Sequence, residues 1–178
     1  DNFIFSKKKS RITNEYSDKI TQILRYKNDA ILISSKTLVA DNPKLNCRIN
    51  GLNKYSPRRI ILDKNLKIKK SSYIYKTLNP MNTIIFYNKD INNKFKLLKK
   101  RGCILIKTSL KKNNFFNLRF VLRKIYSLGC RNLLVEGGKK LTEDFLNENL
   151  FNKFYLFRGS EKLAINGRIN VSSLLNQL

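Results

Sequence analysis

The sequence predicts an α/β fold with a mostly parallel central sheet and helices on both faces. Short apolar runs, such as residues 30–33 and 83–87, are typical of strands buried on both faces. Segments with helical spacing of apolar residues alternate with these runs, and parallel strands need such crossovers. At 178 residues the chain is long enough for one domain with a substantial core.

The first part of the chain predicts a loop, a helix and a strand. Residues 1–11 are polar and basic without periodicity, so we expect a loop there. The next segment has apolar residues at helical spacing: Tyr16, Ile20, Ile23 and Leu24. It predicts a helix that ends near Lys27. A strand over 30–33 follows, and then a polar loop over 34–43.

The middle of the chain continues the alternation. Strands are predicted over 59–62 and 83–87, after the turn signals Pro57 and Pro80. A helix over 93–101 should end at Gly102, and a strand over 103–106 should follow.

The last part contains the clearest helical stripe, over 118–128, with Gly129 placed for a left-handed C-terminal cap. A strand over 132–135 is interrupted by Glu136-Gly137-Gly138, and a helical period resumes from Leu141. Residues 154–157 predict one more strand.

The charge is strongly positive, with 37 Lys and Arg against 12 Asp and Glu, a net charge of +25. Such a balance suggests a polyanionic partner. However, the basic residues are spread along the chain, and Lys, Asn and Ile are enriched together, as in proteins from AT-rich genomes. No helix-turn-helix spacing or aromatic-interleaved basic stretch supports nucleic-acid binding, which stays an alternative. No apolar run reaches the roughly 20 residues of a membrane span, so we expect a cytoplasmic protein.

The residue inventory limits the chemistry. Cys47, Cys103 and Cys130 are widely separated and the chain has no His, so neither a zinc site nor a histidine-based triad is expected. Proton transfer is left to carboxylates, Lys, Tyr or water.

Two segments could carry a site. The turn at Glu136-Gly137-Gly138 allows positive φ and close approach of a ligand, and the following helix start favours phosphate. A tight strand-to-helix connection would explain the glycines equally well, and the G-x-G-x-x-G pattern is absent. Residues 34–48 bring a hydroxyl, a carboxylate and an arginine to the end of a buried strand, although a surface loop can collect these by chance.

The ordered motifs DAILISSKTLVADNPKLNCR (29–48), RRIILD (58–63), LLVEGGKKLTEDFL (133–146) and LFNKFYLF (150–157) resemble the reductase domain of the bifunctional riboflavin-biosynthesis deaminase/reductase. The resemblance implies a dihydrofolate-reductase-like three-layer fold and a homodimer. It also implies NADPH as cofactor, no metal in this domain, and a zinc-dependent deaminase domain upstream in the same chain. The substrate would be a phosphorylated pyrimidine, 5-amino-6-(5-phosphoribosylamino)uracil, whose ribosyl group is reduced to ribityl. We expect residues 1–178 to form one such domain, cut from a longer chain.

The resemblance also assigns residues. For catalysis, the need to handle charge and protons near an iminium favours Asp41 and Glu136. Substrate contacts fall on Arg25, Leu45, Arg48 and Glu136. Cofactor contacts fall on Arg11, Thr37, Asp41, Lys64, Gly138, Lys139, Lys140, Leu141 and Thr142.

Each assignment has a physical basis and an alternative. Arg25 and Arg48 could clamp a phosphate with their guanidinium forks, or be ordinary solvated cations. Lys64 suits the 2′-phosphate of NADPH, whereas Asp63 would suggest the ribose of NADH if the Rossmann rule applied. Asp41 could handle a proton or form an Asx turn before Asn42.

The start of the chain departs from the family, which usually has an SLDGK strand and a GESKWIT segment. This chain has Asn2 and Phe3 in place of the family's Gly and Lys, and Arg11 in place of its Trp. A second candidate is therefore a decayed or repurposed member that keeps a nucleotide pocket.

Overall fold

The computed structural model describes residues 2–6, 12, 14–80, 82–91, 93–159 and 162–176. The chain divides into two compact units, residues 22–138 and residues 1–21 together with 139–178. Each unit has its own sheet.

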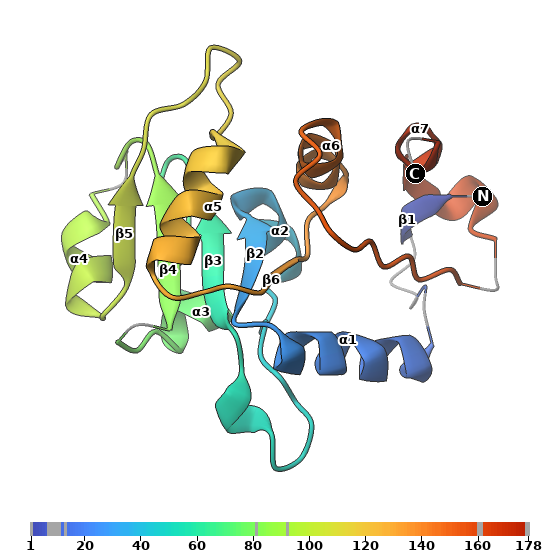
Figure 1. Cartoon of the computed structure of the whole chain (residues 1–178), viewed down its shortest axis with the longest axis horizontal. Coiled ribbons are helices and arrows are strands. Elements are labelled where there is room, and N and C mark those ends of the chain that lie inside the picture. The colour runs from blue at the N-terminus through green and yellow to red at the C-terminus, as the bar shows by residue number, and fades with distance from the viewer. Residues whose placement is uncertain are drawn as a thin grey trace. The chain divides into compact units, whose positions relative to one another are not determined.

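The unit of residues 22–138 contains a five-stranded parallel sheet in the order β5-β4-β3-β2-β6 (Figure 1). Its strands are β2 (Ala30–Ser34), β3 (Arg58–Leu62), β4 (Thr83–Tyr87), β5 (Ile104–Lys107) and β6 (Leu133–Val135). Its helices are α2 (Ser35–Asp41), η1 (Asn53–Tyr55), α3 (Tyr73–Lys76), α4 (Phe95–Lys100) and α5 (Leu118–Ser127). Helix α1 (Glu15–Lys27) crosses the division between the units.

Both faces of this sheet are covered, as expected for strands that are apolar throughout. One face packs against α2, α3 and α4 through fully buried side chains: Ile31, Ile33, Leu38, Ile61, Ile74, Ile85 and Leu98. The alternate strand residues Leu32, Ile60 and Ile84 are also fully buried. Figure 1 shows α5 over that opposite face, where Val121 and Ile125 are buried. The predicted α/β class, with helices on both faces of a parallel sheet, is confirmed.

The other unit contains β1 (Phe3–Ser6), α6 (Lys139–Asn147), η2 (Ala164–Asn166), β7 (Gly167–Asn170) and α7 (Ser172–Leu175). Strands β1 and β7 pair antiparallel, with Phe3 opposite Asn170.

Three local predictions are wrong. The loop predicted over 1–11 contains β1, because its partner β7 is far away in sequence and leaves no local signal. The loop predicted over 34–43 contains α2, because Ser34 caps the helix and Leu38 buries its apolar side. Residues 154–157 form no strand; Tyr155 and Leu156 are exposed, and a strand needs a neighbour to pair with.

The remaining predicted elements are found within one or two residues of their expected ends, and Gly129 has a φ of +85° as its capping position requires. Among the described helices, none combines the length and apolar character needed to cross a membrane.

Candidate active site

The carboxyl ends of β2, β3 and β6 meet at one edge of the sheet. Ser34 lies opposite Leu62, and Leu32 lies opposite Val135. The Glu136 N–H continues the ladder by donating to the Leu32 carbonyl at 3.0 Å. Residues that directly follow these strands therefore emerge at the same edge, where ligands bind in open α/β sheets.

Arg25 and Glu136 form a two-pronged ion pair at this edge. Arg25 Nε donates to Glu136 Oε1 at 2.9 Å, and its Nη2 donates to Oε2 at 2.8 Å. Arg25 Nη1 also donates to the Asn46 carbonyl at 3.3 Å. The two side chains are only 10% and 26% exposed. Arg25 is thus not a solvated cation, and it connects α1, the end of β6 and the loop after α2.

The loop after α2 is anchored by buried contacts. Leu45, with a φ of +58°, packs its side chain in the core at 1% exposure. The Arg48 N–H donates to the buried Gln22 Oε1 at 2.9 Å, while the Arg48 side chain stays exposed. Leu45 therefore holds the loop in place with its side chain, and Arg48 presents its guanidinium to solvent.

Helix α2 presents Thr37 and Asp41 four residues apart, on one face. Ser34 caps the helix: its Oγ accepts from the Thr37 N–H at 3.3 Å and lies 3.2 Å from Thr37 Oγ1. Asp41 is the last helical residue, and the left-handed cap belongs to Asn42 instead. An Asx turn at Asp41 would need the N–H of residue 43, and Pro43 has none, so that alternative does not apply. The protein removes part of the water around the Asp41 carboxyl, and this desolvation raises its pKa.

The turn after β3 is shaped by Asp63, which is fully buried. Its Oδ2 accepts from the Ile68 N–H at 2.9 Å, so this carboxylate is directed into its own turn and not toward a ribose. The Lys64 carbonyl accepts from the N–H groups of Asn88 and Lys89, both at 2.9 Å. Lys64 thus lies where the turns after β3 and β4 join.

The glycine turn differs from its prediction in one respect. Neither Gly137 nor Gly138 is among the described residues with positive φ, so left-handed backbone does not explain them. A Cβ placed on Gly138 would meet only Thr37 Oγ1 within 4 Å, at 3.9 Å. Within the described structure, space is therefore open beside Gly138 and next to Thr37, as close approach of a ligand requires.

Helix α6 begins directly after this turn, at Lys139. Lys139 lies 3.7 Å from Glu143 and Lys140 lies 2.6 Å from Asp144, so both ammonium groups pair with carboxylates one turn further along the helix. Lys139 Nζ also donates to the Asn170 carbonyl at 3.0 Å. Leu141 is buried. The predicted cofactor residues 139–142 form the first turn of this helix. The predicted contact Arg11 lies outside the described residues.

Sequence reasoning missed two members of this arrangement. Ser34 was assigned to a loop, although a serine directly after a strand is a recognisable N-cap signal. Gln22 lies on a helix face with no motif, and nothing in the sequence marks it. Over the described part of the chain, no group of three or more acidic or thiol side chains is arranged to hold a metal.

Comparisons with known proteins agree on one family. The model of the RibD C-terminal domain family matches residues 5–161. The chain is 34% identical over 146 residues to the riboflavin biosynthesis protein RibD of Aquifex aeolicus, covering 82% of this chain and 39% of that protein. It is 28% identical over 165 residues to the 5-amino-6-(5-phosphoribosylamino)uracil reductase of Buchnera aphidicola subsp. Acyrthosiphon pisum, covering 86% and 76%.

A solved structure with a similar fold is the RibD of Acinetobacter baumannii, with a TM-score of 0.66 at 21% identity. The similarity covers 91% of this chain and 45% of that one. The chain thus spans about two fifths of the Aquifex aeolicus protein and less than half of the Acinetobacter baumannii protein.

Proposed function

The chain belongs to the RibD C-terminal domain family, and from this premise we propose that it is a reductase of riboflavin biosynthesis. Its substrate is 5-amino-6-(5-phosphoribosylamino)uracil, and it reduces the ribosyl group to ribityl with NADPH. The observation that carries the proposal is the Arg25–Glu136 pair at the sheet edge where Gly138 and Thr37 leave space for a ligand.

The residues fit an NADPH site. The open space at Gly138 accommodates a close backbone approach, and Thr37 faces that space. We assign the pyrophosphate to Gly138 and to residues 139–142 at the start of α6, because the positive end of a helix dipole favours anions. Lys64 holds the adenosine-side phosphate. Thr37 and Asp41 contact the cofactor from α2, and Arg11 is the remaining cofactor contact. When bound, the nicotinamide supplies the hydride.

The substrate requires one hydride and one proton. Its ribosylamine opens to an imine, which gains the hydride at C1′ and the proton at nitrogen. Glu136, which Arg25 orients through two hydrogen bonds, stabilises the positive charge that develops there. Asp41, whose pKa is raised, supplies the proton. Arg25, Leu45 and Arg48 position the substrate, and the exposed Arg48 guanidinium suits its phosphate.

We further propose that the whole chain is one reductase domain that acts in the cytoplasm, as a homodimer, together with a deaminase domain in the same longer protein. The Aquifex aeolicus RibD supports the longer protein, because it extends well beyond the region this chain matches.

The direct test is a turnover assay that follows the loss of NADPH absorbance with the phosphorylated substrate. We expect saturable NADPH binding and stoichiometric formation of the ribityl product. Absence of saturable NADPH binding by the native protein would contradict the proposal. NADPH binding without turnover would favour the second candidate, a repurposed nucleotide-binding member, which the altered residues Asn2 and Phe3 favour.

A further inference from the structure

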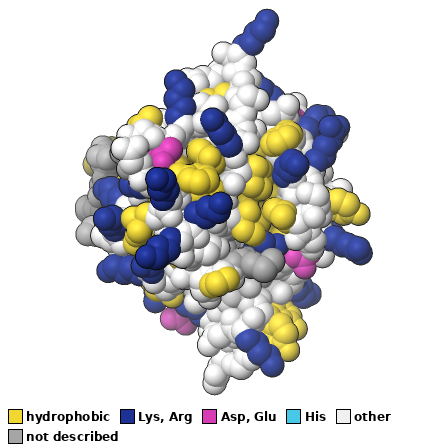
Figure 2. All heavy atoms as spheres, turned by 90° about the vertical axis from the view of Figure 1, so that its left-hand side faces the viewer, with side chains coloured by type: hydrophobic (Ala, Val, Ile, Leu, Met, Phe, Trp, Pro, Cys, Tyr) yellow, Lys and Arg dark blue, Asp and Glu magenta, His cyan; other side chains and the backbone are white. Residues whose placement is uncertain are grey.

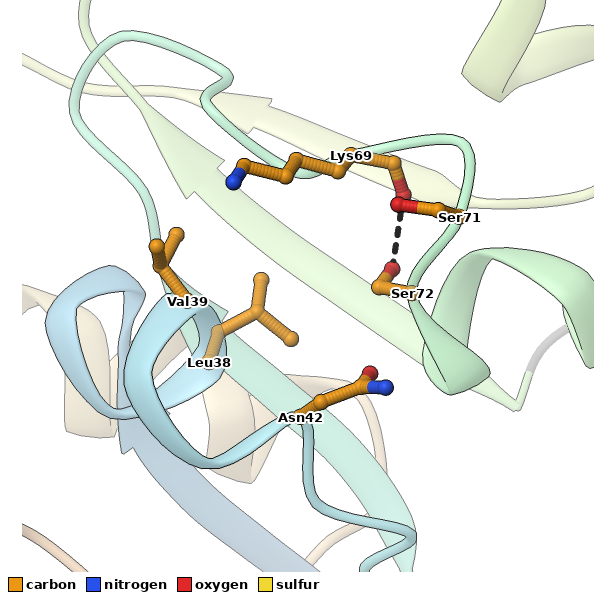
Figure 3. Close-up of a pocket in the computed structure, with 6 residues that line it drawn as sticks. All are labelled: Leu38, Val39, Asn42, Lys69, Ser71 and Ser72. Carbon is orange, nitrogen blue, oxygen red and sulfur yellow. Dashed lines mark hydrogen bonds between the residues drawn. The ribbon is translucent and has the colours of Figure 1, made fainter.

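A small hollow lies between α2 and the turn that precedes α3, and no function is assigned to it above (Figure 3). Its volume is about 170 Å³. It is lined by Leu38, Val39 and Asn42 on one side and by Lys69, Ser71 and Ser72 on the other. One water needs about 10 to 15 Å³ of such space, so the hollow has room for a ligand of roughly ten heavy atoms.

Two of the lining side chains, Asn42 and Ser72, already use their oxygens as acceptors. Asn42 Oδ1 accepts from the Tyr73 N–H at 2.8 Å, which leaves the Asn42 amide nitrogen to donate. Ser72 Oγ donates to the Lys69 carbonyl at 2.7 Å and accepts from the Tyr75 N–H at 3.3 Å. Ser72 is therefore satisfied, and Asn42 offers only its NH₂ group.

Two more donors complete the set. Across the described residues, neither the Lys69 ammonium nor the Ser71 hydroxyl has a side-chain partner, and no carboxylate lines the hollow. Lys44 adds positive charge nearby, since its Nζ lies 5.5 Å from the ring centre of Tyr73. Leu38 and Val39 provide an apolar wall.

We propose that this hollow binds a small oxyanion that carries a short apolar group, such as an alkyl phosphate. The Lys69 ammonium, the Asn42 amide and the Ser71 hydroxyl bind its oxygens, and Leu38 and Val39 contact its carbon atoms. Donors of this kind, one of them charged, are what an acceptor-only ligand requires.

The hollow is separate from the proposed reductase site. Thr37 and Asp41 are not among its lining residues, although Leu38 and Val39 belong to the same helix and Asn42 caps it. Leu38 follows Thr37 by one position, which turns its side chain by about 100° around a helix of 3.6 residues per turn. A ligand in the hollow would therefore bind a different face of α2, and its binding does not depend on the proposed function.

The test is an NMR titration of the ¹⁵N-labelled full chain at constant ionic strength, with inorganic phosphate and with n-propyl phosphate. We expect saturable shifts at the amides of Val39, Asn42 and Ser71. Each methylene that becomes buried should tighten binding by about fourfold, so n-propyl phosphate should bind more tightly than phosphate. Shifts that grow linearly, or that spread over all lysine-bearing surfaces, would overturn the proposal.

Matched variants separate specific binding from general charge. Asn42→Asp keeps the oxygen that accepts from Tyr73 but replaces the donor with a carboxylate, so binding should be lost in a folded chain. Lys69→Gln should weaken binding by about tenfold or more. Lys70→Gln removes the same charge from the neighbouring exposed lysine and should change the affinity by less than about twofold. Equal losses in the two lysine variants would also refute the site.

Discussion

Two carboxylates of the proposed site have different surroundings. Glu136 is held by two hydrogen bonds from Arg25, whereas Asp41 ends a helix and faces partial desolvation that raises its pKa. Such a difference suits two carboxylates with separate roles, one in charge stabilisation and one in proton transfer. The division of roles can be tested at each residue.

Replacement of Asp41 by Asn should lower kcat by about 10²- to 10³-fold, because a positioned proton donor accelerates the reaction by a factor of that order. In the wild type, kcat should fall as the pH rises through the raised pKa of Asp41, since the protonated form is the donor. The variant should lose this dependence. An unchanged kcat and an unchanged pH profile would remove Asp41 from the proton transfer.

The Asp41→Asn substitution should also change the folding stability, and the direction of the pKa shift determines whether the variant gains or loses stability. A folded-state pKa above the ordinary 3.8 means that the folded chain holds the proton more tightly than the unfolded chain. Ionised Asp41 therefore lowers stability above its folded pKa, and the effect fades as the pH falls toward 3.8. Thermal melts should show Asp41→Asn at or above the wild-type Tm at neutral pH and equal to it in acid.

Replacement of Glu136 by Gln should destabilise the chain by about 1 to 3 kcal/mol, because the largely buried Arg25 loses its charged acceptor. Denaturant unfolding measures this cost. Arg25→Met should cost a similar amount, and the double variant should cost less than the sum, since the two groups form one interaction. Strict additivity would show that the pair is not coupled in solution.

At the scale of elements, the sequence determines the strands better than the connections between them. Buried runs such as 83–87 carry their own signal, and the glycine turn could be placed at the end of the strand over 132–135 from it. Helix α2 was missed because its cap at Ser34 and its single buried residue Leu38 make a weak periodic pattern. The Arg25–Glu136 pair could not be predicted, because 111 residues separate its members and only the parallel sheet brings them together.

The strand-to-helix turn yields a prediction that separates a ligand site from a plain connection. Gly138→Ala should leave stability within about 0.5 kcal/mol, because its Cβ would meet only Thr37 Oγ1, at an ordinary contact distance. If the cofactor lies against the backbone of this glycine, NADPH affinity, measured by calorimetry, should fall at least about tenfold.

Gly129→Ala is the matched control. It introduces the same methyl group at a φ of +85°, where left-handed backbone costs an L-residue about 1 to 2 kcal/mol. This variant should lose stability and keep NADPH affinity. If Gly138→Ala instead destabilises the chain and leaves NADPH binding intact, the glycine is only a structural connection.

At the scale of the whole chain, the positive charge is unevenly distributed. Residues 91–135 contain 12 Lys and Arg and no Asp or Glu, so all 12 acidic residues lie elsewhere. Figure 2 shows Lys and Arg side chains around exposed apolar groups, with few acidic ones, on the face that carries α4 and β5. Composition bias toward Lys explains the abundance of cations but not the local absence of carboxylates. A net charge of +25 attracts phosphorylated molecules from a distance.

This field predicts a salt dependence of substrate capture. Raising NaCl from about 0.01 M to about 0.15 M shortens the Debye length from about 30 Å to about 8 Å. The kcat/KM for the phosphorylated substrate should then fall roughly three- to tenfold, while kcat at saturation stays constant, because screening slows encounter and not chemistry. The dephosphorylated substrate should show little change.

Exposed lysines far from the proposed site should contribute to this dependence of kcat/KM on salt concentration. A Lys96→Gln, Lys112→Gln double variant keeps every residue assigned to cofactor or substrate, yet it should flatten the dependence of kcat/KM on salt. If the double variant retains the full slope, the salt effect arises from direct contacts such as Arg48 with the phosphate. The basic face would then act in solubility or in other contacts, and not in the capture of substrate.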